Sequence, residues 1–139
     1  MRWTGLGIRA QEIATAYACK RQAFGKLLID HEGVGFALAE NQIELRQCQL
    51  MIDWCAQALD AGENGNIESS MAKVAVSEAL FRIADRCVQV MRGLGVTADT
   101  IVERFFRETR AFRIYDGPTE VHKWSLAKKI KSAHLKAQQ

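Results

Sequence analysis

A heptad repeat constrains the fold of this chain more than any other feature of its sequence. Between residues 34 and 61, apolar side chains recur every seven residues, at Leu38, Leu45, Ile52 and Leu59. Such spacing is typical of a helix that packs along its length against other helices. A helix over these residues is about 42 Å long at 1.5 Å per residue. The rest of the chain therefore has to supply long helices that cover it.

Four further segments have helical spacing of apolar residues, and they span residues 1–21, 67–92, 97–113 and 118–133. Glycines and short polar turns separate them. Long helices joined by short loops predict an all-α fold, an antiparallel up-and-down helical bundle of four to five long helices. The length of 139 residues is enough for a single domain, residues 1–139, and too short for two.

Local signals predict the helix ends and the buried faces. Asn66 is a candidate N-cap for the third helix, and Thr97 or Asp99 for the fourth. Pro118, the single proline, favours the first position of the last helix. Residues 27–29 read as a short extended piece. The last helix is predicted to turn three apolar side chains inward, Val121, Trp124 and Ile130.

The composition excludes several classes of protein. Hydrophobic residues make up 48% and charged residues 25%, as in a globular domain, and no run of about 18 apolar residues predicts a membrane span. The three histidines are scattered, so no metal site is predicted. Four cysteines without CxxC spacing predict reduced core thiols. The net charge of +3 does not indicate nucleic acid, although lysines crowd the last helix and leave a nucleic-acid binder as an alternative.

Three short segments combine residue types that suit binding or catalysis. Residues 21–26 bring together a guanidinium, an ammonium and an aromatic ring, which suit a phosphate ligand or equally a basic helix end. Residues 89–95 hold a glutamine and two glycines, which would admit a ligand or cap a helix. Asp116 precedes a helix start, where a carboxylate is a cap or a general base. The residues alone leave each pair of alternatives open.

Several stretches, taken together and in order, are similar to one known family. Residues 12–28 read EIATAYACKRQAFGKLL, and residues 31–36 read HEGVGF. Residues 72–79 read AKVAVSEA, and residues 86–95 read RCVQVMRGLG. Residues 103–120 begin with ERFFR and end with IYDGPTE. The chain thus resembles the C-terminal α-helical domain of the acyl-CoA dehydrogenase family, in the branch with an aspartate in its IYEGT-like turn.

The resemblance implies an FAD-dependent acyl-CoA dehydrogenase, which oxidises the α,β bond of acyl-CoA thioesters, with this chain as its FAD-binding and oligomerisation domain. Asp116 would be the base that removes the α proton, and Gly117 would meet the substrate thioester. The flavin contacts implied are Arg21, Phe24, His31, Gln89, Gly93, Thr119 and Glu120. Gln89 and Gly93 would serve the flavin of a neighbouring subunit.

The resemblance also implies partners and a compartment. The partners are the acyl-CoA substrate, an electron-transfer flavoprotein or similar acceptor, and further copies in a homodimer or tetramer. The compartment is the cytoplasm in a bacterium, and the mitochondrial matrix or peroxisome in a eukaryote. A rival interpretation is a non-catalytic helical assembly or scaffold bundle derived from the family.

The sequence departs from the family pattern at four positions. Asp116 replaces the usual glutamate, which withdraws the carboxylate by about 1.5 Å and predicts an altered substrate range. Pro118 replaces a threonine, Arg92 one of two glycines, and Glu32 a glutamine. The first helical pattern begins without a capping signal, which favours a chain cut from a longer protein. Complete family members have two further domains, so we expect the chain alone not to turn over acyl-CoA.

Overall fold

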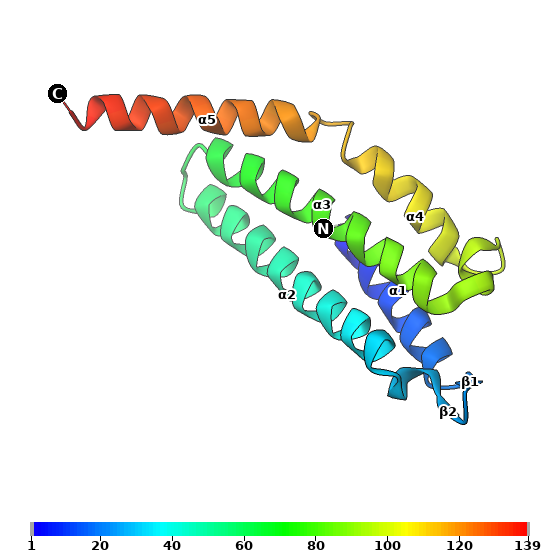
Figure 1. The fold of residues 1–139 in the computed structure, drawn as a ribbon. Helices are drawn as coiled ribbons and strands as arrows, with labels where there is room; N and C mark the ends of the chain where they lie inside the picture. The colour runs from blue at the N-terminus through cyan, green and yellow to red at the C-terminus, as the bar shows by residue number, and fades with distance from the viewer. Residues whose placement is uncertain (1, 139) are drawn as a thin grey trace.

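The chain folds as an antiparallel bundle of helices, which confirms the fold predicted from its apolar spacing (Figure 1). A computed structural model describes residues 2–138. Its α-helices are α1 (Arg2–Ala18), α2 (Glu32–Asp60), α3 (Asn66–Met91), α4 (Ile101–Phe112) and α5 (Thr119–Lys136). The connections contain a small antiparallel hairpin and two 3-10 helices, namely β1 (Gln22–Ala23), β2 (Lys26–Leu27), η1 (Leu28–Asp30) and η2 (Arg92–Val96).

Helix α3 is the centre of the bundle and packs against each of the other four α-helices. Its inward side chains are among the most buried of the core: Val76, Leu80, Ile83, Cys87, Val90 and Met91. Helix α1 comes close to α3 because it presents small side chains there, namely Gly7, Ala10, Ala14 and Ala18. A Cβ atom on Gly7 would lie 2.7 Å from the Leu80 Cδ2 atom. The close approach of α1 thus depends on glycine and alanine at these positions.

Two predicted faces are less buried than their spacing suggests. On α2, Leu38 and Leu45 are buried, whereas Leu59 at the far end is 53% exposed. The inward face predicted for α5 is wrong, because its apolar side chains are exposed: Val121, Trp124 and Ile130. The physical reason is that α5 packs mainly on α3 and then runs out past the α2–α3 connection (Figure 1). These surfaces are free for other contacts.

The helix starts also differ from the local signals. Asn66 is the first helical residue rather than the cap, because Gly65 precedes it with a φ of 65°. Helix α4 is capped by Thr100, whose Oγ1 accepts a hydrogen bond from the Val102 amide at 3.3 Å. Thr97, one of the predicted caps, donates to the Asp99 carboxylate, which was the other. The two predicted cap side chains thus bond to one another in the loop. The cap is Thr100, one residue after Asp99, and α4 begins at Ile101.

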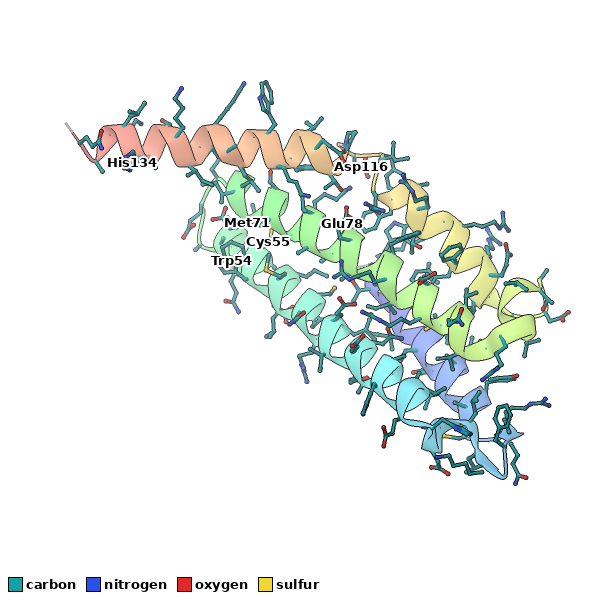
Figure 2. All side chains as sticks on the ribbon, viewed as in Figure 1. Trp54, Cys55, Met71, Glu78, Asp116 and His134 are labelled. Atoms are coloured by element: carbon teal, nitrogen blue, oxygen red, sulfur yellow. The ribbon has the colours of Figure 1, made fainter. Side chains whose placement is uncertain are left out.

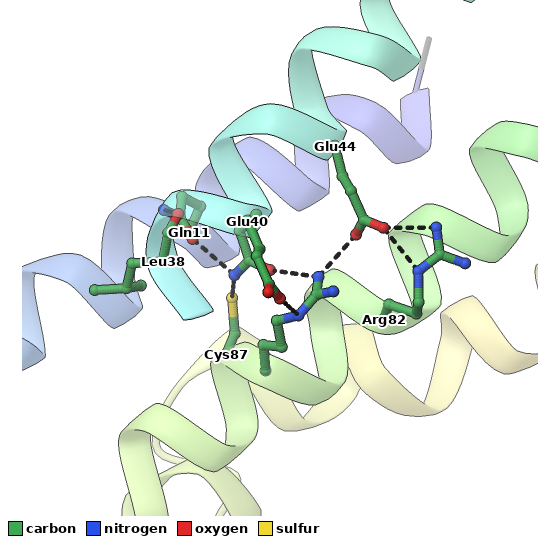
Figure 3. A network of polar contacts seen from close by, with 8 residues as sticks. Gln11, Leu38, Glu40, Glu44, Arg82 and Cys87 are labelled. Atoms are coloured by element: carbon green, nitrogen blue, oxygen red, sulfur yellow. Dashed lines mark hydrogen bonds and ion pairs between the residues drawn. The ribbon is translucent and has the colours of Figure 1, made fainter. Parts of the chain in front are cut away.

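A buried polar network ties three helices together (Figure 3). Asn41 on α2 is fully buried, and its Nδ2 donates to Gln11 Oε1 on α1 at 2.9 Å and to Cys87 Sγ on α3 at 3.5 Å. Arg86 on α3 donates to Asn41 Oδ1 at 3.2 Å and to Glu44 Oε2 at 2.7 Å. Burial raises the pKa of the Cys87 thiol to about 12, so it stays protonated. The network fixes the register of α1, α2 and α3.

The four cysteines are free thiols, of which Cys48 and Cys87 are buried, Cys55 is half-buried and Cys19 is exposed. The prediction of core thiols therefore does not extend to Cys19. No helix within residues 2–138 combines the length and the apolar character needed to cross a membrane. In the same residues, no group of three or more potential metal ligands among His, Cys, Asp and Glu comes together.

Candidate functional site

Each of the three candidate segments contains a residue in a strained backbone conformation. Among residues 2–138, the non-glycine residues with positive φ are Phe24 at 52°, Arg92 at 54° and Asp116 at 53°. An L-residue in this region costs about 1 kcal/mol or more. Such strain persists where the surrounding structure holds it, and it is concentrated at functional sites. The backbone therefore points to the same three segments as the residue types do.

The first segment is the hairpin between α1 and α2. Its tip is Phe24–Gly25, whose φ angles of 52° and 80° are those of a tight two-residue turn with both residues left-handed. Phe24 is 90% exposed, and its ring lies at 81° to the His31 ring with a centroid distance of 6.1 Å. His31 Nε2 lies 3.0 Å from the Ala23 carbonyl oxygen, which ties the hairpin to the start of α2. With Arg21 exposed beside it, the tip presents a cation and an open aromatic face.

The second segment is the end of α3, which lies beside the start of α2. It is therefore at the same end of the bundle as the Phe24 hairpin (Figure 1). A cleft of about 320 Å³ between these helix ends is lined by Gly33, Val34, Arg86, Gln89 and Arg92, among others. The two glycines that follow have different surroundings. A Cβ on Gly93 would meet nothing within 4 Å, whereas one on Gly95 would lie 2.4 Å from the Val88 carbonyl oxygen. Gly95 is thus required for packing, and Gly93 leaves space for a ligand.

The third segment is the turn between α4 and α5, which contains Asp116 (Figure 2). Asp116 is exposed and is followed by Gly117 with a φ of 92°. The turn lies near the start of α1, because the Tyr115 ring is 6.4 Å from that of Trp3. The hairpin follows the other end of α1, about 25 Å away along a helix of this length. Within one chain, the structure does not bring Asp116 together with the Phe24 hairpin.

Two side chains hold the backbone of this turn. Lys73 Nζ on α3 donates to the carbonyls of Phe112 at 2.7 Å and Gly117 at 3.3 Å. Burial lowers the pKa of the Lys73 ammonium, against the opposing effect of the Asp116 carboxylate. His122 Nε2 on α5 lies 3.1 Å from the Asp116 carbonyl oxygen. Sequence reasoning misses both roles. The available signal is that His122 lies in the first turn of the helix that follows Asp116.

The start of α5 is anchored to α3 through Glu78. Thr119 Oγ1 and Arg113 Nε both donate to Glu78 Oε1, each at 2.9 Å. Burial opposes ionisation of Glu78, but these two donors outweigh it and the pKa of the carboxyl lies below its usual value. Thr119 is only 3% exposed, so its hydroxyl is committed to this network, whereas Glu120 faces solvent. Of the two predicted flavin contacts in α5, Glu120 is the accessible one.

Comparisons with known proteins agree with this architecture. The family model for the acyl-CoA dehydrogenase C-terminal domain matches residues 1–131. The chain belongs to the acyl-CoA dehydrogenase family. Acyl-CoA dehydrogenase family member 11 of Rattus norvegicus is 36% identical over 92% of this chain and 17% of its own length. The (R)-benzylsuccinyl-CoA dehydrogenase of Thauera aromatica is 34% identical over 91% of this chain and 32% of its own length.

A solved structure of the family has the same fold. The crystal structure of an acyl-CoA dehydrogenase from Geobacillus kaustophilus matches with a TM-score of 0.88 and 26% identity, over 92% of this chain and 34% of its own. The chain therefore spans about a third or less of the length of these relatives.

The backbone of Arg92 has φ 54° and ψ −131°, a region that glycine alone adopts readily. We expect Arg92→Gly to be more stable than Arg92→Ala by about 1–2 kcal/mol, because both remove the side chain and only glycine relieves the backbone. Urea unfolding of the two variants measures the difference. Equal free energies of unfolding for Arg92→Gly and Arg92→Ala would show that the backbone at residue 92 is not strained.

Proposed function

We propose that this chain is the FAD-binding and oligomerisation domain of an FAD-dependent acyl-CoA dehydrogenase, which oxidises the α,β bond of acyl-CoA thioesters. The observation that carries the proposal is the Asp116 turn, a solvent-exposed carboxylate on a strained backbone that two other side chains hold. In a chain of this family, a carboxylate so presented suits abstraction of a substrate proton. The activity would be that of a complete enzyme, since the chain spans a third or less of its relatives.

The residues at the hairpin end of the bundle fit an FAD molecule. The exposed face of Phe24 suits stacking against an adenine ring, and the planar fork of Arg21 suits pyrophosphate oxygens. Gly93 leaves open space, and the Gln89 amide offers both a donor and an acceptor. These residues would hold the cofactor together with His31. Glu120 lies near the Asp116 turn at the other end of α1, so it would contact an FAD that the hairpin end of a second copy holds, while Thr119 fixes the helix start next to Glu120.

In the proposed chemistry, two different groups remove the α and the β hydrogen of the acyl chain. FAD, when bound, would accept the β hydrogen as hydride. An Asp116 carboxylate oxygen takes the α proton, and the electron pair of that C–H bond becomes part of the new double bond. The Gly117 carbonyl already accepts from Lys73 Nζ at 3.3 Å. The thioester oxygen can only accept a hydrogen bond, so Gly117 would donate to it from its amide N–H. This bond would polarise the thioester carbonyl and make the α proton more acidic.

Exposed apolar side chains support a homodimer or tetramer. On α2 they lie on the face away from the core, at Phe36, Ile43, Leu50 and Trp54. On α5 they include Val121, Trp124 and Ile130. Rows of this length are unusual on a surface that stays in water and are typical of protein interfaces. We assign these faces to contacts between copies of the domain.

The electron acceptor proposed is an electron-transfer flavoprotein. The support is one relative, the CarC subunit of the caffeyl-CoA reductase–Etf complex of Acetobacterium woodii, which is 33% identical over 84% of this chain and 33% of its own length. The substrate class proposed is an acyl-CoA thioester, as in the names of the benzylsuccinyl-CoA and caffeyl-CoA enzymes. The compartment proposed is the cytoplasm in a bacterium, and the mitochondrial matrix or peroxisome in a eukaryote.

The proposal is tested by incubating a complete enzyme that carries this domain with FAD and separating it by gel filtration. We expect the visible flavin band to elute with the protein, at a mass of a dimer or tetramer by light scattering. Arg21→Ala should lower the affinity for FAD about tenfold, because it removes a charge-assisted hydrogen bond. Lys20→Ala, an exposed cation next to it, is the matched control and should change the affinity less than twofold. A colourless, monomeric enzyme would overturn the proposal.

A further inference from the structure

The backbone of Asp116 sets the direction of its carboxylate, and that backbone is strained. Asp116 and Gly117 have successive positive φ angles of 53° and 92°. The turn lies outside any helix or strand, between α4 and α5 (Figure 2). A shift of about 1 Å in a reacting group can cost about a hundredfold in rate. Whatever holds this turn therefore matters for any reaction at Asp116.

The His122 imidazole bridges the turn to α3. Its Nε2 lies 3.1 Å from the Asp116 carbonyl oxygen, and its Nδ1 lies 3.3 Å from the Ser70 hydroxyl oxygen. A carbonyl oxygen can only accept, so Nε2 must carry a proton. In the neutral ring, Nδ1 then accepts from the Ser70 hydroxyl. These contacts determine the tautomer of His122.

The ring fits against the turn because Gly117 has no side chain. A Cβ atom there would lie 2.6 Å from His122 Nε2. Lys73 holds the next carbonyl, that of Gly117, and comes from the same face of α3 as Ser70, three residues away. The two successive carbonyls of the turn are thus held from α3, one by Lys73 directly and the other through His122.

Lys73 and His122 differ in what else they hold. Lys73 also donates to the Phe112 carbonyl at the end of α4, so its loss would disturb that helix as well. The hydrogen bonds of the His122 ring go to the Asp116 carbonyl and to Ser70. We infer that His122 is a positioning residue, whose Nε2–H holds the carbonyl of Asp116 and so fixes the direction from which the carboxylate meets substrate. This inference rests on the proposed function, in which Asp116 is the base.

The kinetic test compares His122→Leu and His122→Gln in a complete enzyme that carries this domain. Leucine fills the space without a donor, and we expect kcat to fall roughly 10- to 100-fold with KM changed less than about threefold. Glutamine can donate from its amide to the same carbonyl, and should recover most of the lost kcat. A wild-type kcat in His122→Leu would overturn the inference, as would equal losses in both variants.

A second test uses the 139-residue chain itself. Long-range ¹H–¹⁵N NMR distinguishes the two neutral tautomers of histidine, and we expect the form with the proton on Nε2. A proton on Nδ1, or rapid averaging between the two, would overturn the inference independently of turnover. The proposed function fails separately: if Asp116→Asn keeps full turnover, the base assignment is wrong. Loss in Asp116→Asn with full turnover in His122→Leu would overturn the positioning role alone.

Discussion

Replacing Asp116 by asparagine is expected to lower kcat of a complete enzyme that carries this domain by about 10²- to 10⁴-fold, with little change in stability. Asparagine has the same shape and, like aspartate, adopts the left-handed φ of 53° at a lower cost than other non-glycine residues, so the substitution adds no backbone strain. Its amide, however, cannot take up the α proton. The measurement is the steady-state reduction of an artificial electron acceptor with acyl-CoA, accompanied by urea unfolding.

This substitution separates the enzyme from the scaffold interpretation. If Asp116 served only to cap α5, asparagine would still cap and turnover would be unaffected. The N-cap of α5 is Pro118, and no side chain caps it, so the structure gives Asp116 no capping role. Asp116→Glu is the matched control, because it keeps the carboxylate and restores the residue usual in the family. Because glutamate moves the carboxylate by about 1.5 Å, Asp116→Glu should be slower than the wild type but faster than Asp116→Asn, with a changed preference among acyl chains. Full turnover in Asp116→Asn would contradict the assignment of the base.

The helices could be predicted from the sequence because they depend on local spacing. The segments expected over residues 34–61 and 67–92 correspond to α2 and α3 within two residues at each end. The burial of individual side chains was predicted less accurately, because it depends on which helices pack against each other. Leu59 continues the heptad of α2 but lies beyond the part of the bundle that covers it. Helix α5 has apolar residues at helical spacing, yet most of its length extends away from the core.

The three segments of the candidate site could be predicted from the sequence. The side chains that hold the Asp116 turn in place could not. The three turns stand out in the sequence because glycines, an aromatic ring and charged residues gather there. The groups that hold the Asp116 turn come from far along the chain, since Lys73 is 44 residues from Gly117 and Ser70 is 52 residues from His122. Contacts at that separation depend on the packing of α3 against α5, which no local pattern encodes. The distance between Asp116 and the hairpin is likewise a property of the bundle.

Replacing Gly95 by alanine is expected to destabilise the domain by about 3 kcal/mol or more. A Cβ atom at this position would lie 2.4 Å from the Val88 carbonyl oxygen and 2.9 Å from the Val88 Cα. These are backbone atoms of α3, so a rotamer change cannot relieve the clash and the end of α3 or η2 has to move. Urea unfolding of the 139-residue chain measures the loss directly.

Gly93 provides the matched control two residues away, because a Cβ atom there meets nothing within 4 Å. We expect Gly93→Ala to change the free energy of unfolding by less than about 0.5 kcal/mol. In a complete enzyme, the same substitution should still weaken FAD binding, since the methyl group occupies the space left for a ligand. Equal stability losses in both variants would mean that the two glycines share one packing role. A loss confined to Gly95→Ala, with weaker FAD binding in Gly93→Ala, would assign packing to one glycine and cofactor contact to the other.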